Sequence, residues 1–218
     1  MLQNQFITER NSKLGQKTAE NLKKRFFDAY YVQTKEEALK KAVELIPKDH
    51  TIAWGGTTSA NDIGLIKYIT ENGYTVINRD AAKTPEEKAD LARKSLLSDT
   101  YIMGTNAISE DGQLVNIDAT GNRIAALIYG PKSVIIIAGV KKVMPSLEDA
   151  IKRARTIAAP TNMQRIAKNS ERNTPCTING TCMDCTSQDS ICSHIVITRL
   201  CKPQGGIKIV LTPDDIGF

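Results

Sequence analysis

The stretch from Gly104 to Lys142 reads GTNAISEDGQLVNIDATGNRIAALIYGPKSVIIIAGVKK and holds a hairpin, a helix and a strand in close succession. Asp111 and Gly112 are a hairpin-turn signal between the runs AIS and QLVNI. A helix is predicted over about residues 121–129, and the run SVIIIAGV after it is typical of a buried strand. Helices and strands that alternate in this way indicate an α/β fold.

Polar side chains gather at the ends of the apolar runs in this stretch. Leaving such groups buried without partners would cost several kcal/mol, so they are expected to be paired. One interpretation is structural, in which they tie the hairpin to the next helix. The other is a pocket, in which an arginine or lysine binds a carboxylate or phosphate. The residues concerned are Asn106, Asn116, Asp118, Asn122, Arg123, Lys141 and Lys142, and Gly121 beside them is a further candidate ligand-binding residue.

Toward the N-terminus, helices and strands continue to alternate. Helices are predicted over residues 34–46, 61–70 and 84–97, and strands over residues 51–54, 74–78 and 99–105. The first of these helices begins with a capping box of Thr34 and Glu37. The order αβαβαβ predicts a mostly parallel, Rossmann-like sheet flanked by helices.

The two ends of the chain add to this core. A polar helix is predicted over about residues 5–29, so residues 1–30 are expected to form an N-terminal helical arm. Residues 31–218 are expected to form one α/β domain that includes a cysteine-rich segment, 174–192. Helices are predicted over residues 146–158 and 160–168, and the runs HIVITRL and GIKIVLT predict two closing strands.

The loop WGGTTSAND, from Trp54 to Asp62, lies between a predicted strand and a predicted helix. Open α/β sheets bind ligands outside the carboxyl ends of their strands, and a helix N-terminus favours anions. The alternative is a tight turn with a Ser or Thr cap. The candidate ligand-binding residues here are Gly55, Gly56, Thr57, Thr58 and Ser59.

Composition narrows the class of protein. The chain has 218 residues, a net charge of +5 and scattered rather than clustered lysines and arginines. Because the aromatic content is low, base stacking is disfavoured and no nucleic-acid partner is expected. The absence of a signal-peptide pattern and of a long apolar run predicts a cytoplasmic protein without a membrane partner.

Four of the five cysteines fall within residues 174–192, with the spacing C-x5-C-x2-C-x6-C. Disulfides fit poorly in a cytosolic chain. Four thiolates suit structural zinc and also an iron–sulfur cluster, although the spacing is not that of a ferredoxin. Free or redox-active thiols remain the alternative. The predicted metal ligands are Cys176, Cys182, Cys185 and Cys192.

The stretch from Gly104 to Lys142, together with AAPTNMQRI and TPC...GTCMDC...IC, resembles the LUD (lactate utilisation domain) proteins over nearly the whole chain. The resemblance implies a fold like that of the ribose-5-phosphate isomerase, glucosamine-6-phosphate deaminase and CoA-transferase group. It also implies a link to the oxidation of lactate to pyruvate, in some members beside iron–sulfur proteins.

A more distant likeness concerns the reaction. GTNAISEDGQLVN...GNRIAALI is similar to a segment of methylthioribose-1-phosphate isomerases in which an aspartate transfers a proton, and Asn106 stands at that position here. An amide cannot act as a general base at neutral pH, so either this chemistry is lost or another acid such as Asp118 takes the role. Where the family usually has Asn-Lys, this chain has Lys141-Lys142. The candidate catalytic residues are Asn106, Asp118 and Arg123.

Three functions follow as hypotheses. The first is an enzyme, or enzyme subunit, acting on a small anionic metabolite such as lactate. The second is an electron-transfer or assembly component with a redox partner protein. The third is a binding module without turnover, with structural zinc at the cysteines. A homodimer is compatible with each.

Overall fold

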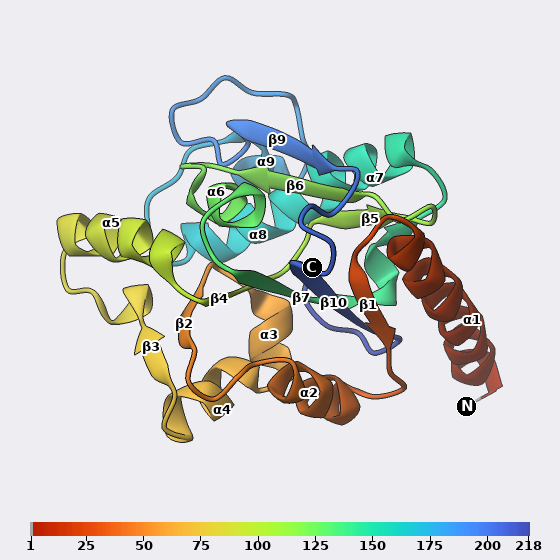
Figure 1. Ribbon diagram of the computed structural model, residues 1–218. Helices are drawn as coiled ribbons and strands as arrows, with labels where there is room; N and C mark the ends of the chain where they lie inside the picture. Colours follow the sequence, from red (N-terminus) through yellow and green to blue (C-terminus); the bar gives the residue numbers. More distant parts are fainter. Residues whose placement is uncertain (1) are drawn as a thin grey trace.

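The computed structural model describes residues 2–218 and contains two sheets (Figure 1). The main sheet has six parallel strands in the order β1-β10-β7-β4-β2-β3. The α/β class with a mostly parallel central sheet is therefore confirmed. The strands are β1 (Asp28–Tyr31), β2 (Thr51–Trp54), β3 (Thr75–Ile77), β4 (Thr100–Met103), β7 (Ser133–Gly139) and β10 (Ile207–Thr212).

The second sheet is smaller and mixed, with the order β8-β5-β6-β9. The hairpin predicted around Asp111 and Gly112 forms the centre of this second sheet. The strands before and after the hairpin in the chain, which end at Met103 and begin at Ser133, belong to the main sheet. Of the two closing strands, one joins each sheet. The strands are β5 (Ala107–Ser109), β6 (Leu114–Asp118), β8 (Val143–Met144) and β9 (His194–Thr198).

The helices cover the outer faces and one edge of the two sheets. Figure 1 shows α2 to α4 on one side of the main sheet and the second sheet with α7 and α8 on the other. No helix in the described range 2–218 is long and apolar enough to cross a membrane. The helices are α1 (Leu2–Lys24), α2 (Lys35–Glu44), α3 (Thr58–Asp62), α4 (Leu65–Glu71), α5 (Pro85–Lys94), α6 (Asn122–Ile128), α7 (Leu147–Arg153), α8 (Ala159–Ala167) and α9 (Pro175–Asn179).

The alternation of side chains along β7 builds two of the three cores. Val134, Ile136 and Ala138 face the second sheet, α1 and α6. Ile135 and Ile137 face α2, α3 and α4. A third core joins the outer face of the second sheet to α7 and α8 through Val115, Ile117, Ala150, Ala154 and Ala159. The molecule is therefore layered as helices, main sheet, second sheet and helices.

Two local predictions were wrong. The N-terminal helix ends at Lys24 rather than near residue 29, because the chain then forms β1 against β10, with Ala29 fully buried. The two helices predicted around Pro160 are joined into one rod by a π-helical turn, Ala154–Ala158. The wider turn ends two residues before Pro160, whose missing N–H usually interrupts a helix.

Candidate functional site

Two small adjoining cavities open between the carboxyl edge of the main sheet, the second sheet and α8. Their volumes are about 170 Å³ and about 70 Å³. We call them together the cleft. Both are lined by the same five residues, which come from the glycine loop, the end of β4, α6 and α8: Gly56, Asn106, Arg123, Asn162 and Arg165.

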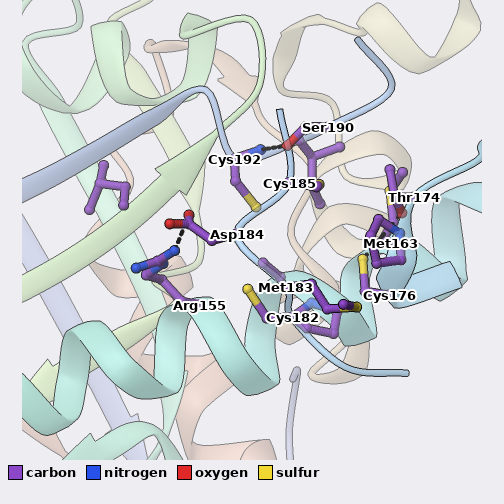
Figure 2. Close-up of a pocket in the computed structure, with 15 residues that line it drawn as sticks. Arg155, Met163, Thr174, Cys176, Cys182, Met183, Asp184, Cys185, Ser190 and Cys192 are labelled. Carbon is purple, nitrogen blue, oxygen red and sulfur yellow. Dashed lines mark hydrogen bonds and ion pairs between the residues drawn. The ribbon is translucent and has the colours of Figure 1, made fainter. Parts of the chain in front are cut away.

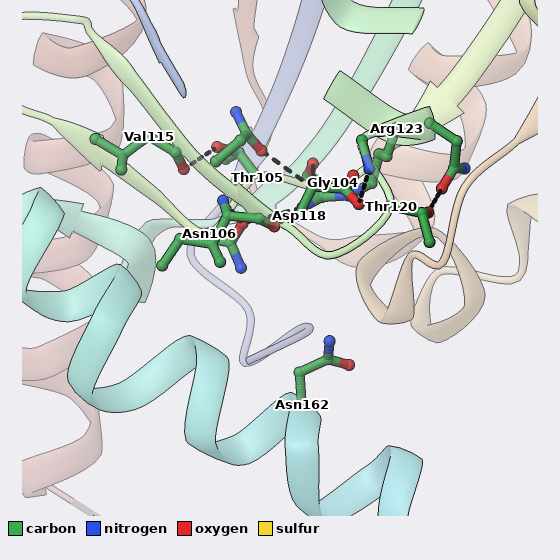
Figure 3. A network of polar contacts seen from close by, with 12 residues as sticks. Gly104, Thr105, Asn106, Val115, Asp118, Thr120, Arg123 and Asn162 are labelled. Carbon is green, nitrogen blue, oxygen red and sulfur yellow. Dashed lines mark hydrogen bonds and ion pairs between the residues drawn. The ribbon is translucent and has the colours of Figure 1, made fainter. Parts of the chain in front are cut away.

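Arg123 organises the floor of the cleft (Figure 3). Its Nη1 donates to the Gly104 carbonyl and to Asn116 Oδ1, both at 3.1 Å. Its Nη2 donates to Asn106 Oδ1 at 3.2 Å and to the Ile117 carbonyl at 2.5 Å. Burial lowers the pKa of this guanidinium. The contacts show Arg123 tying the hairpin to α6, as the structural interpretation of the sequence predicts.

Asn116 and Asp118 reach Arg123 because they lie two residues apart on β6 and share one face of it. Asp118 Oδ2 lies 3.5 Å from Arg123 Nε, and its Oδ1 accepts from the Gly121 N–H at 3.2 Å. Asp118 Oδ2 and Asn116 Nδ2 are buried without a hydrogen-bond partner. Buried polar atoms are nearly always paired, so these two atoms are exceptions. Asp118 lines the larger cavity, whereas Asn116 lines neither cavity.

Asn106 is held by its side-chain oxygen. In addition to Arg123, this oxygen accepts from the Ile117 N–H at 2.9 Å. Asn106 lines the cleft, and Figure 3 shows Asn162 of α8 on the opposite side of the space, apart from the network. The contacts of the Asn106 oxygen support a positioning role for its amide.

Lys142 is buried, with 4% of its surface exposed, and lines the smaller cavity. Its Nζ donates to Ser59 Oγ at 3.0 Å and to the Thr105 carbonyl at 3.2 Å. Burial, reinforced by the charges of Arg153, Lys141 and Arg123, lowers the pKa of this lysine to about 7. Lys141 instead pairs with Asp215 and is not among the residues that line the cleft.

The glycine loop contributes in two ways. Gly55 is buried, and a Cβ atom there would lie 2.8 Å from the Tyr101 hydroxyl and 3.1 Å from the Arg123 side chain. Gly55 therefore makes room for the network, whereas Gly56, Thr57, Thr58 and Ser59 line the smaller cavity. Thr57 also caps α3, accepting from the Ala60 N–H at 3.3 Å, so the turn-and-cap alternative is present as well.

The lining residues that the sequence predictions missed include Arg79, Asn162 and Arg165. Arg79 follows β3 at the edge where β2 and β4 also end, which is the signal that could have identified it. Asn162 Oδ1 accepts from Arg165 Nη2 at 2.8 Å. Gly121 and Asn122 begin α6, and Asn122 lines the larger cavity.

The four clustered cysteines line one further cavity of about 70 Å³ (Figure 2). They come from α9 and the loop after it, and Met163 and Pro160 of α8 form part of the wall. All five cysteines are free thiols, and Cys201 lies apart, buried in the main core. Burial is the main cause that raises the pKa of Cys192, with smaller contributions from the other three thiols of the cluster.

The chemistry of these donors fits a four-thiolate metal centre. However, within residues 2–218 no group of three or more His, Cys, Asp or Glu side chains is placed so that it could hold a metal ion. The cysteine cavity and the larger cavity of the cleft share Ala159 and Ile191 in their linings. The two candidate sites are therefore neighbours on either side of α8 and the segment before β9.

Comparison with solved structures supports the fold. A DUF162 family protein from Deinococcus radiodurans is similar with a TM-score of 0.51 at 10% identity, over 93% of this chain and 98% of that chain. The eIF2B delta subunit from Chaetomium thermophilum matches with a TM-score of 0.35 at 16% identity, over 55% of this chain and 54% of that one. Ribose 5-phosphate isomerase from Plasmodium falciparum matches with a TM-score of 0.30 at 15% identity, over 51% and 52%.

These last two likenesses cover about half of each chain. No curated protein matches this chain. The family model for the LUD domain matches residues 15–212, which span both sheets, most of the cleft and the cysteine segment. The chain therefore belongs to the LUD domain family, which supports a function related to lactate utilisation in general terms.

Proposed function

We propose that the cleft binds a small carboxylate of the lactate and pyruvate class, and that the chain works in lactate utilisation as a carboxylate-binding enzyme or enzyme subunit. The observation that carries this proposal is the excess of positive charge in the cleft. Arg79, Arg123, Arg165 and Lys142 line it, and the acid that lines it, Asp118, already faces Arg123.

The four cations have different roles in the proposal. Arg123 is fully engaged with the hairpin and supplies positive potential from the floor. Arg165 of α8 is exposed, and its guanidinium donates to Asn162 Oδ1 on the same helix, a contact that a bound carboxylate can replace. Arg79 has a buried Nε that has no hydrogen-bond partner and lies 3.7 Å from Asp80 Oδ1. Guanidinium groups bind carboxylates through two parallel hydrogen bonds, so Arg79 and Arg165 are the proposed carboxylate ligands.

Binding is tested by thermal unfolding with lactate, pyruvate, inorganic phosphate and chloride at matched ionic strength. A ligand at one hundred times its Kd stabilises the folded state by about 2.7 kcal/mol, which gives a measurable rise in Tm. We expect a rise with lactate or pyruvate that Arg165→Gln reduces. Arg172→Gln, an exposed arginine outside the cleft, is the matched control. No rise with either acid would contradict the proposal.

We also propose that Cys176, Cys182, Cys185 and Cys192 bind an iron–sulfur cluster. Such a cluster supplies one-electron transfer when bound. Two observations support this: the four thiols line one cavity, and that cavity shares a wall with the cleft. A redox centre beside a carboxylate site suits the oxidation of lactate.

A structural zinc ion is the second candidate, favoured by the scarcity of regular structure in the segment that carries the ligands. Between residues 170 and 193 the structure has one helix, the five-residue α9. A tetrahedral zinc site is a common way to hold such a segment. Either centre requires the thiols to converge further than they do in the described structure, so binding must also tighten this loop.

Purification without oxygen, followed by measurement of iron, acid-labile sulfide and zinc, separates the candidates. Matched iron and sulfide with a visible absorption band support the cluster, whereas zinc alone supports the clamp. We expect Cys182→Ser to lose the bound metal and Cys201→Ala, which alters a buried thiol outside the cavity, to retain it. Protein without any of these elements would contradict both candidates.

A further inference from the structure

Lys142 has the surroundings of a nucleophile as well as those of a cation. It follows β7 in a short turn, Val140–Lys142, and its Nζ lies in the smaller cavity between Ser59 of α3 and the carbonyl of Thr105. The C-terminal segment packs over it, since a Cβ atom at Gly217 would lie 2.7 Å from Nζ. The amine is thus held at a defined position beside ligand-sized space and shielded from bulk water.

No carboxylate in the described part of the chain, residues 2–218, lies within ion-pair distance of this amine. The charged groups that act on it are Arg153 of α7, Lys141 of its own turn and Arg123 of α6, all positive, with Asp62 of α3 as a weaker opposing charge. Burial among like charges favours the neutral amine, whose pKa is lowered to about 7. A neutral lysine is the form that attacks carbonyl groups.

We propose that Lys142 forms an imine with the carbonyl carbon of a 2-oxo acid bound in the cleft. The Nζ lone pair forms the new C–N bond while the carbonyl π bond breaks, and one Nζ proton moves to the former carbonyl oxygen to give a carbinolamine. The carbinolamine hydroxyl then leaves as water with the second Nζ proton, and the nitrogen lone pair forms the C=N bond. No oxidant or reductant is consumed.

The neighbouring groups fit the two ends of such a substrate. Ser59 Oγ, 3.0 Å from Nζ, can pass protons between the amine and the departing oxygen. Arg165 lines the same cavity from α8 and can hold the carboxylate. This inference rests on the proposed carboxylate site, but it adds a covalent step that binding alone does not require.

The test is reductive trapping. Protein is incubated with pyruvate and sodium cyanoborohydride, and the adduct is located by mass spectrometry of the intact chain and of its peptides. We expect one reduced adduct on Lys142, with a yield that rises as the pH is raised through about 7. Lys142→Arg and Lys142→Met are expected to lose the adduct. Lys141→Met, at the exposed neighbour paired with Asp215, is expected to keep it.

Thermal unfolding with pyruvate on the same samples separates this inference from the proposed function. A pyruvate-induced rise in Tm without an adduct at Lys142 would overturn the imine and leave the carboxylate site standing. Neither signal would overturn both. Adducts spread over exposed lysines at the same level as Lys142 would also overturn the imine, because they would indicate unselective chemistry. Retention of the fold by the two Lys142 variants is checked by circular dichroism.

Discussion

At the scale of the residue, Asn106 lines the cleft, but its side-chain oxygen serves to hold the surrounding structure together. Its side-chain oxygen accepts from both Arg123 Nη2 and the Ile117 N–H. Asn106→Ala should lower the free energy of unfolding by about 1–3 kcal/mol, because two donors are then left without their acceptor. Urea denaturation measures the change. Gln188→Ala, an exposed amide, is the control and should have little effect. Equal stability of the two variants would show that the network does not depend on Asn106.

Asn106→Asp tests the same position differently. The carboxylate keeps the shape of the amide and both acceptor contacts, so this variant should fold and recover most of the stability that alanine loses. If it instead behaves like the alanine variant, the Nδ2 group rather than the oxygen is the important one.

Lys142 makes a prediction about pH. Its pKa is about 7 in the folded state and near 10.5 when unfolded, so the unfolded chain binds more protons between these two values. Its contribution therefore makes the folded state more stable as the pH rises from 7 to 10, by at most about 1.4 kcal/mol per unit. Lys142→Met removes this dependence of stability on pH. The free energy of unfolding of the variant, relative to that of wild type, should therefore be highest at pH 7 and below.

Urea unfolding of wild type, Lys142→Met and the control Lys141→Met between pH 6 and 10 checks this. Parallel curves for wild type and Lys142→Met would mean that the buried ammonium carries no penalty. The control should keep most of the wild-type dependence on pH, because burial is the main cause that lowers the pKa of Lys142 and Lys141 supplies one of three smaller contributions.

At the scale of the element, the β5–β6 turn is fastened to α1. Asn21 Nδ2 donates to the Glu110 carbonyl at 2.8 Å, and Arg25 Nε donates to the Asp111 carbonyl at 2.5 Å. Gly112 has φ of +90°, and a Cβ atom there would lie 2.9 Å from the backbone of α1 at Leu22. The turn fits against α1 only if residue 112 is glycine.

Gly112→Ala should therefore destabilise the protein more than a positive φ alone accounts for. Gly73→Ala is the matched control, since Gly73 has φ of +71° and open space around its Cα. Strain at a positive φ costs about 1–2 kcal/mol, and backbone overlap should add about 1–3 kcal/mol at Gly112. Equal changes in Tm for the two variants would show that α1 yields without cost.

The elements that the sequence predicted correctly are those with local signals. Thr34 accepts from the N–H group of Glu37, as expected for the cap of α2, and Thr84 accepts from the N–H group of Glu87 in the same way at the start of α5. The predicted strands β2, β4 and β7 each have one hydroxyl residue at the first position, and almost all the residues that follow are apolar. By contrast, β1 and the two-residue β8 were missed, because their backbones become strands only by pairing with β10 and β5, which are distant in the chain.

At the scale of the whole molecule, β10 completes the main sheet. It pairs with β1 on one side and with β7 on the other. The last strand in the sequence therefore lies between the first strand and β7 in the main sheet. A chain truncated after residue 199 should lose cooperative unfolding, because β1 then has no partner and the apolar faces of β7 lose Ile209 and Val210. Far-UV circular dichroism during urea unfolding measures this, and a sharp wild-type-like transition would contradict it.

The sequence by itself determined the fold class, the family and the residues that make up the Arg123 network, because periodicity, caps and one long motif are local properties. It also identified the four cysteines that line one cavity. Tertiary structure decided how these parts meet. It moved the hairpin into a second sheet, turned Lys141 to Asp215 while burying Lys142, and brought Arg79 and Arg165 to the cleft from segments almost ninety residues apart. The physical reason is that burial and ion pairing depend on neighbours supplied by distant segments, which adjacent residues do not encode.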